Sequence, residues 1–477
     1  MNTVGMMLRW PRRALALVPP LALWACASQG DLHTQVRPID PARVGLQAPA
    51  SVEVDLASAP GWWQGLGDPA LDQLIDLTLR DNPGMQTAAS RLERAQAGLV
   101  LAGSADYPQL QGKVEIDRQR FTEHGIVPPP LGGSTRSTAT LQLEGHWEVD
   151  LFGRHRAELE SAVGQHKAAQ ADAQATRVLL SSQVARAYVQ LARLLAQREV
   201  AQLALAERQT LLDLTRQRVR AGLDTVVEQH LSEGALPDAH QQIEAIDEQI
   251  MLTRHQLSAL SAQPMAAVEG LQPDLGRLKV HALADSLPMN LLAQRADILA
   301  NRWRAEAAGA QSDVARTYFY PDLNINAYLG FNAIGLDRWL KAGSQQWGVL
   351  PALDLPLFDG DRRRSMLQSR LADQDAAIAA YNQSVIDAAR EVADQVGSTR
   401  SIERQRHEQA QAQQSATAAF EVAKQRYQAG LGPYLTVLNA EAAVLTQRRL
   451  RADLTGRALD ARISLARALG GHWPSQP

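Results

Sequence analysis

The chain offers few residue patterns that could support catalysis or metal binding. None of the motifs G-x-x-x-x-G-K-[ST], G-x-S-x-G and H-E-x-x-H occurs in its 477 residues, so the common phosphate-binding loop, nucleophile elbow and zinc-protease helix are missing. The 11 histidines include no H-x-x-x-H pair, and methionines are sparse after the N-terminal segment, which argues against a copper-handling path. We therefore expect a protein that is not an enzyme and that uses no metal and no cofactor.

Composition excludes two further classes. With 48 basic and 51 acidic residues, the chain carries no electrostatic footprint for nucleic acid. After the N-terminus it contains no apolar window of about 18 residues, the length that a transmembrane helix needs. Aromatic residues make up 5% of the chain, which suits long helices better than a large compact core.

The single cysteine, Cys26, ends an N-terminal segment that is typical of secretion. A basic start precedes the short apolar run Ala14–Ala25, and the cysteine follows a small residue. This is the pattern of a bacterial lipoprotein signal, in which the chain is cleaved before the cysteine and the cysteine is acylated. The alternative is an ordinary signal peptide with an incidental cysteine. We predict that residues 1–25 are a lipoprotein signal peptide, that Cys26 is the lipidation site, and that 26–60 form an extended arm.

Strands are predicted by a strict alternation of apolar and polar residues. From Leu141 to Asp150 the apolar residues alternate with Gln142, Glu144, His146, Glu148 and Asp150. Trp347, Val349 and Leu353 repeat this alternation in the second half of the chain, and weaker partners precede each stretch. We expect two β-hairpins, at 112–150 and 323–357.

Each hairpin is followed by a very long helical run. Arg154–Ala221 and Asp361–Ala429 contain no proline and one glycine each, so each predicts a helix on the order of 100 Å long. Helices of this length cannot pack inside a globule and must pack on one another. Glycine turns lead into returning helices, which gives helical hairpins at 154–262 and 361–469. Pro237 lies inside the first returning helix and is expected to kink it.

The two halves of the chain are an internal repeat. Arg218-x-x-Ala221-Gly222-Leu223 recurs as Arg426-x-x-Ala429-Gly430-Leu431, at the turns between the long helices. The first repeat is expected at 61–270, a connector at 271–289, and the second repeat with a C-terminal tail at 290–477.

Four strands per chain are too few for a membrane barrel, which needs at least about eight. A soluble sandwich sheet would also fit the strands alone. The lipid signal and the long helices favour a barrel built from several chains. Two chains would give eight strands and a filled lumen, whereas three would give twelve and leave a channel, with the polar strand face lining water.

Almost the whole chain resembles the TolC/OprM-type outer membrane factors, in particular the lipoprotein branch that serves resistance-nodulation-division efflux pumps. The resemblance rests on short segments in a characteristic order: Trp62-Trp63, Gly67-Asp68-Pro69 with Leu71, Asn82-Pro83, Tyr107-Pro108, Leu287-Pro288 with Leu291-Leu292, Arg295-Ala296-Asp297-Ile298, Tyr320-Pro321-Asp322, Leu357-Phe358, and Arg426-Tyr427-x-Ala429-Gly430 with Leu438.

The resemblance implies a mainly α fold with membrane strands. Long helical hairpins would form an α-barrel, and the chain would be a homotrimer with a 12-stranded outer membrane β-barrel. It also implies a periplasmic adaptor (membrane fusion) protein and an inner-membrane pump as partners, an acylated Cys26 in outer membrane lipid, and an α-barrel that extends into the periplasm. Three departures are Ala296 in place of proline, Pro237, and Gly432 where an acidic residue is usual.

The resemblance draws attention to the helical turns as a closing site. The candidates for a tip or gate are polar residues beside the turns: Arg218, Arg220, Asp224, Arg426 and Tyr427. The arginines are equally explained by the dipole at a helix C-terminus, and Asp224 by a solvated turn. The candidates for adaptor contacts are the turn residues, which also serve as C-caps: Gly222, Leu223, Gly430 and Leu431.

The leading hypothesis is a passive outer membrane duct for small amphiphilic compounds. A duct for type I protein secretion is the alternative within the same fold. An enzyme on a helical scaffold lacks a paired nucleophile and base, and a periplasmic coiled-coil adaptor would have one long hairpin where this chain has two.

Overall fold

The structure is a computed structural model that describes residues 31–39, 61–279 and 294–471. The predicted signal peptide, Cys26 and most of the predicted arm and connector lie outside the described residues. The chain forms two compact units. Unit 1 contains residues 1–38, 93–168 and 301–380, and unit 2 contains residues 39–92, 169–300 and 381–477.

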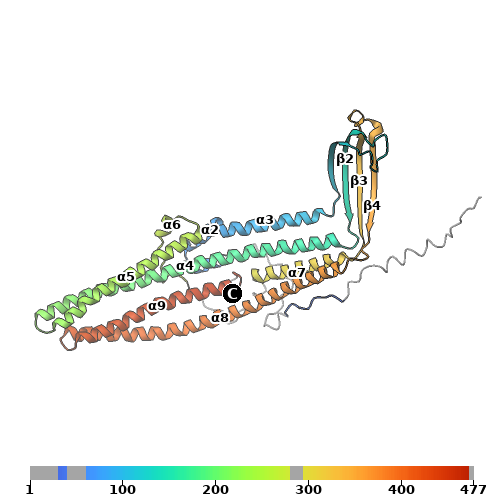
Figure 1. Ribbon diagram of the computed structural model, residues 1–477. Helices are drawn as coiled ribbons and strands as arrows, with labels where there is room; N and C mark the ends of the chain where they lie inside the picture. Colours follow the sequence, from blue (N-terminus) through green and yellow to red (C-terminus); the bar gives the residue numbers. More distant parts are fainter. Residues whose placement is uncertain (1–30, 40–60, 280–293, 472–477) are drawn as a thin grey trace, which may run out of the picture. The chain divides into compact units, whose positions relative to one another are not determined.

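Unit 1 contains one four-stranded sheet (Figure 1). Its strands are β1 (Gln109–Arg120), β2 (Thr135–Val149), β3 (Asp322–Ile334) and β4 (Gln345–Asp354). The spatial order is β1-β2-β3-β4, and every neighbouring pair is antiparallel. The two hairpins predicted from alternation are therefore joined into one sheet by the β2–β3 pair. Among the described residues, nothing pairs with the outer edges of β1 and β4.

The register places most of the polar residues of β1, β2 and β3 on one face. His146 lies opposite Asn326, and Glu148 lies opposite Asn324, so the polar residues predicted in the two halves share that face. The His146 Nδ1 and Asn326 Oδ1 atoms are 2.9 Å apart. The polar face is thus tied across strands by side-chain hydrogen bonds, which also include Gln111 Nε2 to Glu144 at 2.8 Å and Gln346 Nε2 to Gln142 Oε1 at 2.8 Å.

The opposite face of the sheet is apolar and exposed in the single chain. Leu143, Trp147 and Val349 keep 52%, 39% and 62% of their surface accessible. An apolar sheet face that its own chain leaves open indicates a partner or a lipid environment.

Two glycines allow close approach within the sheet. A Cβ at Gly330 would lie 2.1 Å from the carbonyl oxygen of Leu141, and a Cβ at Gly348 would lie 2.8 Å from the ring of Tyr328. At Gly330 the overlap is with the backbone of the neighbouring strand, so the two strands can approach this closely only with glycine there. At Gly348 the Tyr328 ring would have to shift.

The long helices follow the strands as expected. The helices of the first half are η3 (Trp62–Leu66), α2 (Pro69–Asp81), α3 (Pro83–Ser104), α4 (Arg154–Arg220), α5 (Val226–Ser261) and α6 (Met265–Glu269). Those of the second half are α7 (Ala296–Thr317), η5 (Leu336–Arg338), η6 (Ala342–Ser344), α8 (Arg362–Gln428) and α9 (Tyr434–Ala468). Helices α4 and α8 have 67 residues each, as the duplication predicts.

The core of unit 2 lies where α2, α4, α5 and α9 pack together. Leu71, Leu191, Leu257 and Leu459 are fully buried there. Asp68 caps α2 by accepting a hydrogen bond from the backbone N–H of Ala70, as its position before a proline predicts.

Helix α5 runs on both sides of Pro237. Proline removes one backbone donor, which weakens this part of the helix. Arg208 of α4 contacts α5 at the same place, donating to the carbonyl oxygen of Ala235 at 2.9 Å and pairing with Asp238 at 3.3 Å. Its Nε also donates to the buried Glu441 of α9 at 3.1 Å. The kink itself stays a prediction.

In unit 1, the segment that precedes residue 39 lies against helices. Leu32 packs against a buried apolar cluster from α7, the turn after it, and α8 that contains Phe319 and Leu367. The backbone N–H groups of Gln35 and Val36 donate to Asp375 at 3.0 Å.

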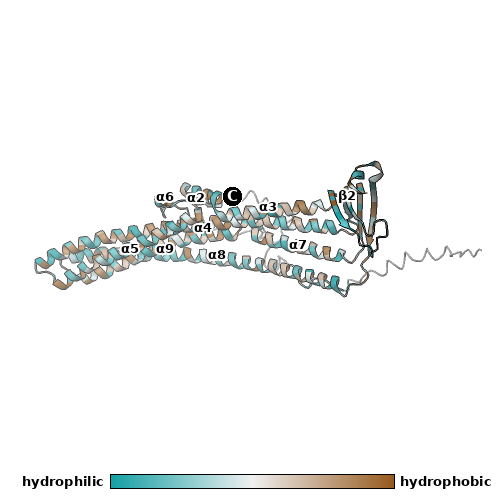
Figure 2. Ribbon diagram, turned by 45° about the horizontal axis from the view of Figure 1, so that its top comes forward, coloured by the Kyte–Doolittle hydropathy of each residue, from teal (hydrophilic) through white to brown (hydrophobic). Residues whose placement is uncertain are grey.

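The helices have mixed polar and apolar surfaces along their length (Figure 2). In the part of the chain that the structure describes, none is both long enough and apolar enough to cross a membrane.

Candidate functional site at the helical turns

The turns between the long helices share one backbone geometry. Gly222 and Gly430 have φ angles of +74° and +76°. The N–H of Leu223 donates to the carbonyl of Arg218 at 2.9 Å, and the N–H of Leu431 donates to that of Arg426 at 2.7 Å. This left-handed C-cap closes both helices and explains why glycine recurs at this place in each repeat.

The start of α5 is fixed by a capping box directly after the first turn. The Thr225 side chain accepts from the N–H of Val227, and the Thr225 N–H donates to Glu228 at 3.0 Å. The preceding residue, Asp224, is therefore held at a defined position between α4 and α5.

Asp224 forms a two-bond ion pair with Arg218. The Nε and Nη2 atoms of Arg218 donate to the two carboxylate oxygens at 2.8 and 3.2 Å. The side chains of Arg218 and Asp224 are only 11% and 10% exposed. A bidentate pair that is shielded from water is the strong form of this interaction.

Tyr427 joins this ion pair from the second turn. It is fully buried, and its hydroxyl donates to Asp224 Oδ2 at 2.6 Å. The hydroxyl also lies 3.1 Å from Thr215 Oγ1, and the Arg218 guanidinium lies 4.6 Å from the centre of the tyrosine ring. Arg218 Nη1 donates to the backbone carbonyl of Tyr427 at 3.0 Å. These four residues, the tip cluster, therefore connect the α4–α5 turn to α8.

The contacts within the tip cluster shift the pKa values of Asp224 and Tyr427. The hydrogen bonds from Arg218 hold the pKa of Asp224 below its usual range, against the opposing effect of burial. Burial and the hydrogen bond to Asp224 raise the pKa of Tyr427 to about 12. The aspartate thus stays ionised and the tyrosine stays a hydrogen-bond donor over the whole physiological range.

The structure brings only some of the predicted tip residues together. Arg218, Asp224 and Tyr427 meet, whereas Arg220 and Arg426 are exposed and donate only to the backbone carbonyls of Arg216 and Leu431. The role predicted for these five residues in closing a channel stays a prediction.

The predicted adaptor contacts are accessible. Leu223 and Leu431 are 65% and 69% exposed, one at each turn. Sequence reasoning missed Thr215 and Tyr434. Thr215 lies one helical turn before Arg218, and the Tyr434 ring centre lies 5.6 Å from that of Tyr427. Helical spacing from Arg218 could have indicated the threonine.

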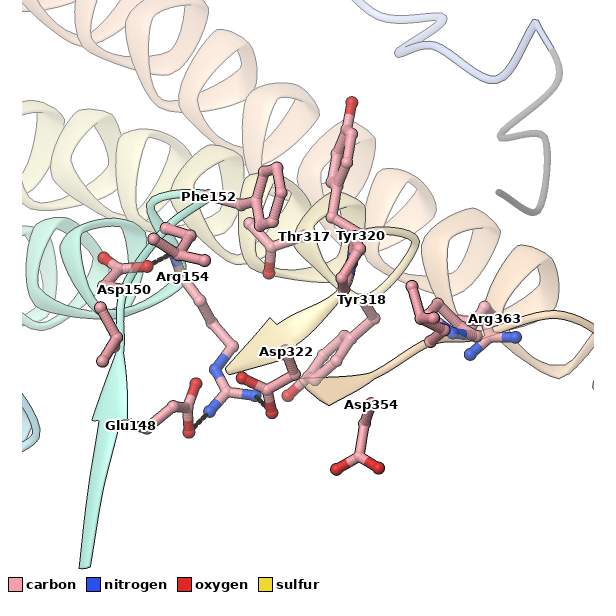
Figure 3. Close-up of a pocket in the computed structure, with 15 residues that line it drawn as sticks. Glu148, Asp150, Phe152, Arg154, Thr317, Tyr318, Tyr320, Asp322, Asp354 and Arg363 are labelled. Atoms are coloured by element: carbon pink, nitrogen blue, oxygen red, sulfur yellow. Dashed lines mark hydrogen bonds and ion pairs between the residues drawn. The ribbon is translucent and has the colours of Figure 1, made fainter. Parts of the chain in front are cut away.

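A second site is a cavity of about 320 Å³ in unit 1, where the strands meet the helices. It lies at the ends of β2 and β4 and at the start of β3 (Figure 3). Arg154 lies between the carboxylates of Glu148 and Asp322, pairing with both. Arg363 lines the same cavity and pairs with Asp359 at 3.0 Å. Among the described residues, no group of three or more histidine, cysteine or acidic side chains is placed to hold a metal ion.

Comparison with known proteins shows the family to which the chain belongs. The Outer membrane efflux protein family matches residues 74–263 and 287–471. The chain is an outer membrane efflux protein. The "Multidrug resistance outer membrane protein MdtP" of Shigella flexneri is 32% identical to it over 432 residues, 87% of each chain. The "Pyoverdine export outer membrane protein OpmQ" of Pseudomonas putida is 29% identical over 466 residues, 97% of this chain and 98% of the relative.

A solved structure gives the same result for the fold of this efflux protein. The outer membrane protein VceC of Vibrio cholerae superposes with a TM-score of 0.81 at 32% identity, covering 86% of this chain and 98% of that one. The predicted mainly α fold, with long helical hairpins and membrane strands in a duplicated chain, is confirmed. The protein therefore works in the outer membrane, as a channel for efflux.

Proposed function

We propose that this outer membrane efflux protein is the passive exit duct of a tripartite system. Three copies would form a 12-stranded β-barrel, beneath which the long helices would form an α-barrel extending into the periplasm. A periplasmic adaptor protein and an inner-membrane resistance-nodulation-division pump would deliver drugs or other small amphiphilic compounds. The duct itself would need no cofactor and catalyse no reaction.

The observation that carries this proposal is the sheet with two unlike faces and two open edges. Exposed strand edges readily pair with other chains, and the edges of β1 and β4 have no partner among the described residues. Joining copies through these edges satisfies the backbone groups. Three copies give twelve strands, enough to leave a lumen, which the hydrogen-bonded polar face would line while the apolar face meets lipid.

The tip cluster supports a proposal for closing the duct. Arg218 and Asp224 belong to the α4–α5 hairpin, while Tyr427 belongs to α8. The bond from the Tyr427 hydroxyl to Asp224 and the bond from Arg218 to the Tyr427 carbonyl hold the two hairpins together within one chain. Moving the hairpins apart would break these contacts, so the cluster favours the closed arrangement. Arg220 and Arg426, which are exposed, would act at contacts between copies. The exposed Leu223 and Leu431, with their glycines Gly222 and Gly430, would receive the adaptor.

The described segment that follows the proposed lipid anchor, Cys26, packs on helices of unit 1. Leu32, six residues later, packs on a cluster that contains Leu367, close to the start of α8 where the strands end. We propose that Cys26, which precedes this segment in the sequence, carries the acyl chain that anchors the protein in the membrane.

A susceptibility panel tests the proposed function. A strain that lacks this gene should become sensitive to a defined set of amphiphilic compounds, and plasmid-borne wild-type protein should restore resistance. If the panel is unchanged while a secreted protein is lost from the culture supernatant, the alternative of a type I secretion duct replaces this proposal. Loss of the mass expected for an acylated N-terminus in a Cys26→Ser variant would test the lipid anchor.

A further inference from the structure

Two sets of exposed residues lie at the strand–helix junction of unit 1, and the duct proposal uses neither. The first is an apolar patch formed by Leu151, Phe152, Leu357 and Phe358, which follow the ends of β2 and β4. Their exposed fractions are 55%, 45%, 65% and 90%. Leu151 and Phe152 line the junction cavity, and the Phe152 ring stacks on Tyr320 at 4.8 Å.

The second feature is a set of three exposed arginines, Arg156, Arg362 and Arg364, in the first turns of α4 and α8. Among the described residues, none of their side chains has a carboxylate partner. Their neighbours differ, because Arg154 pairs with Glu148 and Arg363 pairs with Asp359. Positive charge at a helix N-terminus opposes the helix dipole, so these three arginines do not stabilise the helices on which they lie.

Both repeats place the two features in the same order. Phe152 is followed by Gly153 and then by Arg154 and Arg156, whereas Phe358 is followed by Gly360 and then by Arg362 and Arg364. An aromatic residue with an arginine just beyond it matches the boundary of a membrane, where aromatic rings lie at headgroup level and cations reach the phosphates.

We propose that the junction is a binding surface for anionic glycerophospholipids in the inner leaflet of the outer membrane. Phosphatidylglycerol is the representative lipid. The apolar patch contacts the glycerol and upper acyl region of the lipids, and the arginines of α4 and α8 bind their phosphates. This proposal rests on the proposed function only in that the strands cross the outer membrane. It places the inner boundary of that membrane at Phe152 and Phe358.

The test uses full-length protein in a neutral detergent and two soluble short-chain lipids, phosphatidylglycerol and phosphatidylcholine, with binding followed by titration calorimetry. Each arginine close to an anionic surface strengthens binding about fivefold. The R156Q/R362Q/R364Q variant should therefore bind phosphatidylglycerol at least tenfold more weakly and bind phosphatidylcholine as before. Phe358→Ser should weaken both lipids, since its ring is exposed and contributes only apolar contact.

Two control variants separate headgroup binding from general charge and from folding. R400Q/R404Q/R406Q removes three exposed arginines from the middle of α8 and should change neither affinity. R156K/R362K/R364K keeps the charge and should keep most of the preference for phosphatidylglycerol. The proposal is overturned if R400Q/R404Q/R406Q loses as much affinity for phosphatidylglycerol as R156Q/R362Q/R364Q does. It is also overturned if R156Q/R362Q/R364Q keeps the wild-type preference for phosphatidylglycerol.

Two further outcomes are decisive. If lipid A binds the arginines more tightly than phosphatidylglycerol does, the inner-leaflet assignment is wrong. If wild-type protein restores drug resistance but shows no preference for the anionic lipid, the lipid proposal fails while the duct proposal stands. If wild-type protein prefers the anionic lipid but does not restore drug resistance, the lipid proposal stands and the duct proposal fails.

Discussion

The tip cluster allows a quantitative prediction about closure. Asp224→Ala removes the hydrogen bond that the Tyr427 hydroxyl donates between the two hairpins. It also frees Arg218, which Asp224 holds in place for its own bond to the Tyr427 carbonyl, at side chains that are about one-tenth exposed. A hydrogen bond to a charged group contributes about 1.5–3 kcal/mol, and loss of a fully buried partner costs about 3–5 kcal/mol. Because the turn borders solvent, we expect Asp224→Ala to destabilise the closed arrangement by about 2–3 kcal/mol. This shifts the closed-to-open ratio roughly 30- to 150-fold.

Tyr427→Phe should shift the closed-to-open ratio less than Asp224→Ala does. It removes one hydrogen bond to the carboxylate but keeps the ring on Arg218 and Tyr434, so we expect about 1.5–2 kcal/mol, or roughly a 10- to 30-fold shift. Arg400→Gln is the control, since it removes an exposed arginine from the middle of α8, away from the tip cluster. It should change the ratio less than threefold.

Two assays report the closed-to-open ratio. Ion conductance of the purified protein in planar bilayers should rise in the order Arg400→Gln, Tyr427→Phe, Asp224→Ala. Cells that express the variants should admit a large hydrophilic antibiotic in the same order. If Asp224→Ala conducts like the wild type while its folded yield is normal, the cluster does not hold the duct closed and the reasoning is refuted.

The same contacts predict how closure depends on pH. The pKa of Asp224 is lowered in the cluster, so its contribution is present above its ordinary pKa and is lost as pH falls through the lowered value. The pKa of Tyr427 is raised to about 12, so its contribution is complete below its ordinary pKa and is lost only as pH rises through about 12. Conductance should therefore be flat from about pH 5 to 9 and increase in strong acid. A midpoint near pH 6 to 7 would assign closure to other groups.

Three further predictions concern stability. Gly430→Ala should cost about 1 kcal/mol in thermal unfolding, because alanine is strained at a φ of +76°, and Gly430→Asn should cost less. Gly330→Ala should prevent assembly of heat-resistant oligomers, since a Cβ would overlap the neighbouring strand, whereas Gly343→Ala meets open space and should assemble normally. Glu441→Ala should destabilise the helical unit by about 2–4 kcal/mol by leaving a mostly buried Arg208 short of a partner, while Glu441→Gln, which keeps an acceptor, should cost less than half as much.

Local rules were enough to predict most elements. Alternation along Leu141–Asp150 indicates a strand with one polar face, because successive side chains in a strand point to opposite sides. Missing prolines between Arg154 and Ala221 indicate one long helix, and Gly222 indicates where it ends. These signals depend only on neighbours in the chain, so they are readable without the fold.

Contacts between distant segments were decided by tertiary structure. Sequence spacing places Asp224 in a turn, where a solvated aspartate is the ordinary expectation, and it gives no sign that Tyr427, some two hundred residues later, donates to the same carboxylate. The joining of the two hairpins through β2 and β3 is also invisible to alternation, which fixes the face of a residue but not its partner strand.

The sequence by itself therefore determined the elements, their duplication and the polar and apolar faces of the strands, because each follows from the period and stiffness of the local backbone. Only the tertiary structure decided which of the predicted tip residues meet. It selected Arg218, Asp224 and Tyr427 and left Arg220 and Arg426 exposed, because the direction of each side chain around a helix depends on how the two hairpins pack.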